Sequence, residues 1–309
     1  MFVTSVTVRV PAKINLQLAV GPLRPDGYHG LVTVFHAVSL FDDVTAATAE
    51  SDSVLVSGEG AGLIPENADN LALRAVRALR EAIARRAIDA PGAGVAVTIA
   101  KRIPVAGGMA GGSADAAAAL VACNELWGAG LTQQELCAVG AQVGSDVAFL
   151  VLGGTAVGRG RGEQLAPALA FPVDFHWVLA LADGHLSTPA VFRTLDKQRA
   201  GQDVPEPELS SALMAALRAG DVERLGAALS NDLQEPAITL FPALRKTLDA
   251  GREAGALGAL VSGSGPTTYF LARDEAHATD LARSLSGAGV CRAVATAAGP
   301  APGASVIVS

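Results

Sequence analysis

The chain has 309 residues, half of them hydrophobic, and a formal net charge of −7. This length suffices for about two domains of ~150 residues each, and the acidic balance argues against nucleic acid or an anionic membrane as the main partner. An anionic small molecule stays compatible, because a local cationic pocket can override the net charge. No apolar stretch of ~18 residues and no signal-peptide pattern occurs, so no membrane span is expected. The three cysteines lack metal-site spacing, which is typical of reduced thiols in a cytoplasmic protein.

The first half of the chain predicts strands followed by helices. Apolar residues alternate with polar ones over 6–10, as in a half-buried strand that Pro11 interrupts and that resumes at Ile14. Further strands are expected at 31–41, near Val54, at 95–100, and on both sides of the GRGRG turn at 158–162. Helices are expected at 70–87, at 113–127, and after Thr132, which forms a capping-box pattern with Glu135.

The second half restarts near Phe171 with alternating strands and helices, which favours an α+β arrangement. A polar, proline-containing loop is expected at 196–207. The predicted strands are 175–183, the two arms of a glycine turn within 256–272, and 291–297; the predicted helices are 209–218, 222–229, 243–254 and 275–286.

The stretch IPVAGGMAGGSADAAAAL, residues 103–120, places four glycines directly before an alanine-rich helix. Successive glycines let backbone N–H groups converge without obstruction by Cβ atoms, and a helix N-terminus adds unpaired donors and about half a positive charge. Together they form a cradle for an anion, most often phosphate. The loop lacks the lysine of a Walker motif and the spacing of a dinucleotide fingerprint. The alternative is a tight strand-to-helix connection that needs small residues.

Three polar residues accompany this loop. Ser113 could cap the helix, donate to a phosphate or ligate magnesium. Lys13 lies in an otherwise apolar strand on the same face as Asn15, and such a lysine normally needs an anionic partner; a snorkelling lysine is the alternative. Asp146, in GSDVAFLV, precedes a hydrophobic run and is either a functional carboxylate or a helix N-cap.

These stretches, in this order and together with VSGSGPTTYF at 261–270, resemble the GHMP kinase superfamily, which is named for galactokinase, homoserine kinase, mevalonate kinase and phosphomevalonate kinase. The longer segments PAKINLQLAV, RPDGYHGLVTVFHAVSLFDDV and GSDVAFLVLGGTAVGRGRGE extend the similarity along nearly the whole chain. They resemble the branch of the superfamily whose acceptor is a cytidine diphosphate-linked methylerythritol in the non-mevalonate isoprenoid pathway. The DGYH segment separates this branch from mevalonate and homoserine kinases.

The resemblance implies an α+β, two-domain GHMP kinase fold. Residues 1–165 would form a domain like domain 2 of ribosomal protein S5 and would carry the glycine loop; residues 166–309 would form a ferredoxin-like domain, with the active site in the cleft between the two. It also implies that ATP, with Mg²⁺, phosphorylates the 2-hydroxyl of the methylerythritol part. The protein would be a cytoplasmic enzyme with a small-molecule substrate and no obligate protein partner.

The resemblance also assigns site residues. Lys13 and Asp146 would be catalytic, Ser113 would touch magnesium, Tyr28 and His29 would bind the cytosine, and Phe192 would form the opposite wall unless it is a core residue. Asn15 and Thr188 would make polar contacts with the acceptor. The ATP phosphates would be held by Pro104, Val105, Ala106, Gly107, Gly108, Met109, Ala110, Gly111, Gly112, Ser113 and Ala114. Two alternatives remain at this point: a GHMP kinase with another acceptor, or a non-catalytic nucleotide-binding relative, which would be expected to lack Lys13 or Asp146.

Overall fold

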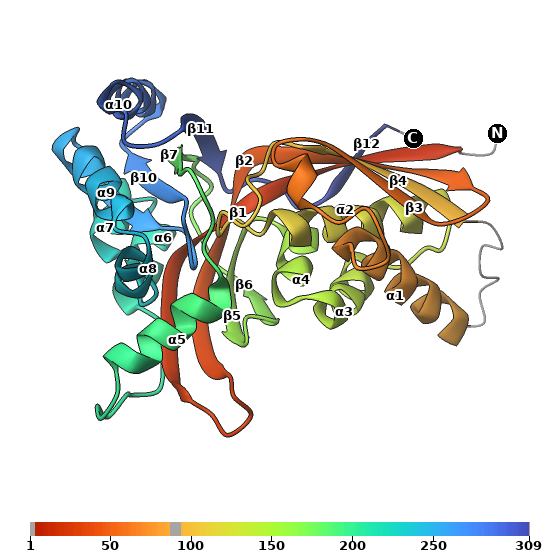
Figure 1. Ribbon diagram of the computed structural model, residues 1–309, viewed down its shortest axis with the longest axis horizontal. Helices are drawn as coiled ribbons and strands as arrows, with labels where there is room; N and C mark the ends of the chain where they lie inside the picture. The colour runs from red at the N-terminus through yellow and green to blue at the C-terminus, as the bar shows by residue number, and fades with distance from the viewer. Residues whose placement is uncertain (1–3, 87–93, 309) are drawn as a thin grey trace.

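The computed structural model describes residues 4–86 and 94–308 and contains two β-sheets (Figure 1). Within the described residues, the first sheet has eight strands, with β12-β1-β2-β4-β3 as its main order. The strand β5 also pairs with β2 and β6, and β8 pairs with β1. Their bounds are β1 Ser5–Leu23, β2 His29–Ala49, β3 Ser53–Gly58, β4 Gly94–Lys101, β5 Thr155–Gly160, β6 Gln164–Pro167, β8 Ser230–Asn231 and β12 Ser305–Val308.

The long antiparallel pair β1 and β2 runs from one half of the molecule to the other (Figure 1). The prediction that Pro11 interrupts the first strand until Ile14 is wrong, because β1 continues through it. The register shifts between Pro11 and Ala12, and such an irregularity accommodates a residue that has no N–H to donate. The strand β2 is also longer than the predicted 31–41 at both ends.

Four helices pack beside the first sheet (Figure 1). They are α1 Leu71–Arg85, α2 Gly111–Leu126, α3 Gln133–Val143 and α4 Ser145–Leu152. The capping box of Thr132 and Glu135 is confirmed at the start of α3. The helix α2 begins at Gly111, two residues before the predicted start, and most of its side chains are buried in the core. The predicted end of the first helix, Ala87, lies outside the described residues.

The second sheet is antiparallel, with the order β11-β7-β10-β9, and helices α9 and α10 contact it. Its strands are β7 Phe175–Leu181, β9 Gly258–Val261, β10 Thr268–Ala272 and β11 Ala293–Gly299. The helices of this half are α5 Thr188–Gln198, α6 Ser211–Ala219, α7 Val222–Ala228, α8 Gln234–Leu240, α9 Ala243–Glu253 and α10 Glu275–Ala288. A short 3₁₀ helix lies in the first half at Ala61–Leu63.

The elements α5, α8 and β12, together with the short 3₁₀ helix and the two-residue strand β8, were not expected from the sequence. The helix α5 takes in the first three residues of the loop predicted at 196–207, and Pro189 stands in its first turn, where a missing N–H breaks no bond. The strand β12 carries the end of the described chain back to the first sheet, beside β1. In the part of the chain that the structure describes, no helix has the length and apolar character needed to cross a membrane.

Candidate active site

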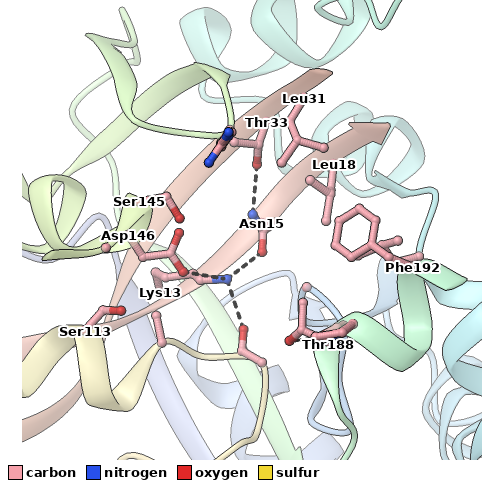
Figure 2. Close-up of a pocket in the computed structure, with 18 of the residues that line it drawn as sticks. Lys13, Asn15, Leu18, Leu31, Thr33, Ser113, Ser145, Asp146, Thr188 and Phe192 are labelled. Atoms are coloured by element: carbon pink, nitrogen blue, oxygen red, sulfur yellow. Dashed lines mark hydrogen bonds and ion pairs between the residues drawn. The ribbon is translucent and has the colours of Figure 1, made fainter. Parts of the chain in front are cut away.

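A pocket of about 1350 Å³ lies where the glycine loop, the β1–β2 pair, the start of α4 and the helix α5 converge. Figure 2 shows Lys13 at its centre, with Asp146 and Ser113 on one side and Thr188 and Phe192 on the other. The pocket therefore brings together residues from both halves of the sequence. All of the predicted catalytic and acceptor-binding residues line it: Lys13, Asn15, Tyr28, His29, Asp146, Thr188 and Phe192.

Three carbonyl groups of the glycine loop accept hydrogen bonds from other parts of the chain. The Gly107 oxygen accepts from the Thr267 N–H at 3.1 Å. The Gly108 oxygen accepts from Lys13 Nζ and from Ser262 Oγ, each at 3.0 Å. The Met109 oxygen accepts from the Lys13 N–H at 3.3 Å. In a trans peptide the N–H points opposite to the C=O, so the N–H groups that follow these carbonyls point away from the donors named above.

The loop backbone is unusual in two alanines. Ala106 and Ala110 have φ of 52° and 61°, a left-handed conformation that costs an alanine about 1–2 kcal/mol. Gly108, with φ of 80°, packs so closely that a Cβ would lie 2.0 Å from the Ser262 carbonyl oxygen. Strained conformations of this kind persist when the surroundings hold them, and they concentrate at ligand sites.

The predicted nucleotide residues divide into two groups. Those that line the pocket are Ala106, Gly107, Gly108, Ala110, Gly111, Gly112 and Ser113. Pro104, Val105, Met109 and Ala114 do not line it, and the side chains of Met109 and Ala114 are fully buried in the core.

Lys13 is buried and faces three oxygens. Its Nζ donates to Asn15 Oδ1 at 2.8 Å and to the Gly108 carbonyl, and it lies 3.9 Å from Asp146 Oδ2. The prediction that Lys13 and Asn15 share a strand face is thereby confirmed. Burial lowers the pKa of Lys13, and the charge of Asp146 acts in the opposite direction. The ammonium is thus held by polar contacts and is not a snorkelling surface group.

Asp146 lies in the first turn of α4, and its side chain is partly exposed to the pocket. The N-cap of α4 is Gly144, which makes no side-chain cap, so the alternative role of Asp146 as an N-cap is wrong. A carboxylate in a first helical turn is stabilised by the helix dipole. Asp146 is therefore presented to the pocket beside a buried ammonium.

The far side of the pocket is aromatic. Tyr28 is half-exposed, and the Arg161 guanidinium lies 3.6 Å from the centre of its ring. His29 is buried and stacks on Phe192 with ring centres 5.4 Å apart, while its Nδ1 contacts the Gly21 carbonyl at 2.9 Å. Phe192 is only partly buried, so it forms a wall of the pocket as well as a packing contact.

The helix α5 carries three polar or aromatic side chains of this wall at intervals of four residues. Thr188 bonds Ser264 through the hydroxyl groups at 2.8 Å, Phe192 stacks on His29, and Asp196 lies 3.1 Å from His29 Nε2. Residues four apart on a helix share a face. Asp196 was not expected here, because the sequence interpretation assigned it to a surface loop.

Other supporting residues were also missed. Thr33 accepts from Asn15 Nδ2 at 2.8 Å and donates to the Gln17 carbonyl, and the Tyr269 hydroxyl donates to the Asn15 carbonyl. Side chains alternate along β2, so Thr33 and Phe35 lie on the same face of the strand. This alternation is the sequence signal that could have identified Thr33. Nothing local to Tyr269 indicates the contact, because it joins the two sheets.

Magnesium can be tested against the donors that are present. Among the described residues no cluster of three or more His, Cys, Asp or Glu side chains could hold a metal ion. Mg²⁺ usually keeps several waters and binds one or two protein oxygens together with substrate phosphates. The Ser113 hydroxyl and the Asp146 carboxylate in one pocket fit that mode, and they do not form an all-protein cage.

The comparisons agree with this geometry. Residues 70–154 match the model of the GHMP kinases N terminal domain, and residues 213–291 match that of the GHMP kinases C terminal. A 4-diphosphocytidyl-2-C-methyl-D-erythritol kinase from Thermobifida fusca is 57% identical over 98% of this chain and 99% of its own length. A relative of the same name from Streptomyces coelicolor is 56% identical over 98% and 99%.

A solved structure leads to the same group. The crystal structure of a 4-(cytidine 5'-diphospho)-2C-methyl-D-erythritol kinase superposes with a TM-score of 0.73 at 34% identity, over 94% of this chain and 98% of that one. A homoserine kinase from Cytophaga hutchinsonii superposes with a TM-score of 0.74, but at 18% identity that likeness shows the fold alone. The chain belongs to the GHMP kinase superfamily and, within it, to the family of 4-diphosphocytidyl-2-C-methyl-D-erythritol kinases.

Proposed function

We propose that this chain transfers the γ-phosphoryl group of ATP to the 2-hydroxyl of 4-diphosphocytidyl-2-C-methyl-D-erythritol. One observation carries the proposal: the Lys13–Asp146 pair, 3.9 Å apart, shares a pocket with the N-terminus of α2 and with an aromatic wall. The wall suits a nucleobase, and the loop and helix end suit a polyphosphate. The alternative of a non-catalytic relative is disfavoured because both charged residues are present and face the pocket.

Phosphoryl transfer depends mostly on positioning and on stabilising charge. The loop N–H groups and the first turn of α2 would hold the ATP phosphates. Lys13 would face the transferring group, because its ammonium is fixed by Asn15 and by the Gly108 carbonyl. Asp146 would orient the acceptor hydroxyl and accept its proton.

Magnesium would be held by Ser113, with the nucleotide phosphates as its main ligands. The carboxylates of Asp146, Glu163 and Asp196 also line the pocket. When bound, the ion would neutralise charge on the β- and γ-phosphates. The protein's own contribution is the hydroxyl at the third residue of α2, directly after the glycine loop.

The acceptor would enter from the aromatic side. Tyr28 and Phe192 would contact the cytosine faces, His29 its edge, and Asn15 and Thr188 the polar atoms nearer Lys13. In the same proposal, the division between the two domains falls at residues 165 and 166, and the enzyme acts in the cytoplasm without an obligate protein partner.

The decisive experiment measures ADP formation with ATP, Mg²⁺ and one acceptor at a time: 4-diphosphocytidyl-2-C-methyl-D-erythritol, mevalonate or homoserine. We expect turnover with the first acceptor and a kcat/KM at least about 10³-fold lower with the others, because buried polar groups left unpaired strongly disfavour the wrong substrate. Equal or greater turnover with mevalonate or homoserine would overturn the assignment of the acceptor.

A further inference from the structure

A cluster of charged residues is buried behind the glycine loop and does not line the pocket. Lys101 Nζ contacts Asp42 Oδ2 at 2.5 Å and Asp115 Oδ2 at 2.9 Å. The three side chains are 0%, 0% and 3% exposed. Charged residues are almost never buried to this extent unless they are paired. None of the steps of the proposed reaction uses them.

The cluster joins the two ends of the loop. Lys101 ends β4, and Asp42 Oδ1 accepts the backbone N–H groups of Arg102 and Ile103 at 2.5 and 2.9 Å, directly before the loop begins. Asp115 lies in α2, directly after the loop ends. One ammonium therefore ties the strand that enters the loop to the helix that leaves it.

The ammonium also lies close to the first residue of that helix. A Cβ built on Gly111 would lie 3.1 Å from Lys101 Nζ, which is tighter than an ordinary contact. Gly111 lines the pocket on its other side. The position of the first turn of α2, where phosphate would bind, thus depends directly on where Lys101 is held.

Stability alone does not explain the arrangement. Two carboxylates share one ammonium, and Asp115 Oδ1 has no hydrogen-bond partner among the described residues. Burial raises the pKa of Asp115 to about 7. Buried ion clusters can often be replaced by apolar residues without loss of stability, whereas they specify geometry in some systems. These observations favour a role of the cluster in setting local geometry over a role in stability.

We propose that Lys101 and Asp115 are positioning residues for nucleotide binding: through their buried contact they set the distance between the end of β4 and the first turn of α2. The inference rests on the proposed function in that the loop holds ATP, and it does not depend on the identity of the acceptor. Asp42 fixes the other side of the same link through the backbone of Arg102 and Ile103.

The test uses Asp115→Ala and Asp115→Asn in the full chain. The alanine variant leaves Lys101 paired with Asp42, so the core keeps a balanced ion pair and the variant is expected to fold. ATP affinity is measured by calorimetry without acceptor, and KM for ATP and for the acceptor is measured separately. We expect Asp115→Ala to weaken ATP binding about 10-fold, the usual effect of losing a charge-assisted hydrogen bond, with KM for the acceptor unchanged.

The conservative variant and a matched control separate positioning from stability. Asp115→Asn keeps an oxygen that accepts from Lys101, so it should restore ATP affinity to near the wild-type value. Asp52→Ala is the control, because Asp52 pairs with Arg80 and accepts the Val95 N–H away from the pocket; it should lower the melting temperature and leave ATP affinity unchanged.

Three results would overturn the inference: wild-type ATP affinity in Asp115→Ala, an Asn variant no better than the alanine variant, or an equal loss of ATP affinity in Asp52→Ala. Failure of the proposed function would give a result different from these three. In that case the wild-type chain binds ATP but does not phosphorylate the cytidine diphosphate-linked acceptor.

Discussion

Asp146 and Lys13 form the pair on which the chemistry depends. Their charged atoms are 3.9 Å apart, and Lys13 is by far the more buried of the two. Burial lowers the pKa of Lys13, and only the charge of Asp146 opposes that effect. Neutralising Asp146 would therefore remove the proton acceptor and also weaken the positive charge of Lys13.

We predict that Asp146→Asn lowers kcat by about 10²–10⁴, the usual range for loss of a general base, with a melting temperature close to that of the wild type. Steady-state kinetics and thermal unfolding test this directly. Asp249→Asn is the control, since Asp249 is half-exposed on α9 and pairs with Arg252; it should leave kcat unchanged. Wild-type kcat in a folded Asp146→Asn protein would remove Asp146 from the mechanism.

The glycine loop and the helix α5 are two of the elements that shape the pocket. The loop is held by three hydrogen bonds to its carbonyls from Ser262, Thr267 and the Lys13 side chain, in addition to the backbone contact of Met109. The helix α5 presents Thr188 and Phe192 on one face. Changes in the loop should affect ATP, and changes in α5 should affect the acceptor.

For the loop, Gly108→Ala is expected to lower the free energy of unfolding by about 1–3 kcal/mol, as overpacking does, and to weaken ATP binding at least tenfold. The reason is a Cβ that would lie 2.0 Å from the Ser262 oxygen at a φ of 80°. Gly287→Ala is the matched control: it lies in α10 with no atom within 4 Å of the added Cβ. That variant should gain about 0.5–1 kcal/mol in stability. Undiminished ATP binding in Gly108→Ala would contradict this description of the loop.

For the helix, Phe192→Ala is expected to raise KM for the acceptor about 10- to 100-fold, because aromatic stacking on a base contributes about 1–3 kcal/mol. KM for ATP should stay within twofold. Lys197 is exposed on the same helix, so Lys197→Ala serves as the control and should change neither constant. If both KM values rose together in Phe192→Ala, the residue would support the fold and not the acceptor.

At the scale of the whole molecule, His36 lies where the two sheets meet. It belongs to β2, bonds Thr155 through Nδ1 at 2.8 Å, and makes edge contacts with Phe175 and Trp177 of β7. It is fully buried, and burial lowers its pKa to about 3. The folded protein therefore keeps His36 neutral at pH values where the unfolded chain protonates it.

The sign of the pH effect follows. As pH falls below about 6.5 the unfolded chain gains a proton at His36 and the folded chain does not until about pH 3, so this residue makes folding less favourable in that window. We predict that the free energy of unfolding of the wild type, measured relative to that of His36→Gln, falls by about 2 kcal/mol between pH 8 and pH 5. Urea unfolding of both proteins at the two pH values measures it, and groups such as Asp115 cancel in the difference. A constant difference would contradict the role given to His36.

Much of the site could be predicted from local sequence. The glycines before Ser113 indicate an anion cradle because their effect on the backbone is local, and the alternation along β1 placed Lys13 and Asn15 on one face. The capping box at Thr132 is local in the same way. The resemblance of several segments to one superfamily was specific enough to identify the family, which the comparisons confirm.

Other features were decided only by tertiary structure. The helix α5 has a proline in its first turn and few apolar residues, so its stability comes from the packing of Val191 and Leu195 against β1 and α8, which no local pattern contains. Lys101, Asp42 and Asp115 look like ordinary surface charges in the sequence, and only the packing of α2 against the first sheet removes them from water. Short-range geometry depends on neighbouring residues in the chain, whereas burial and ion pairing depend on which distant segments come together.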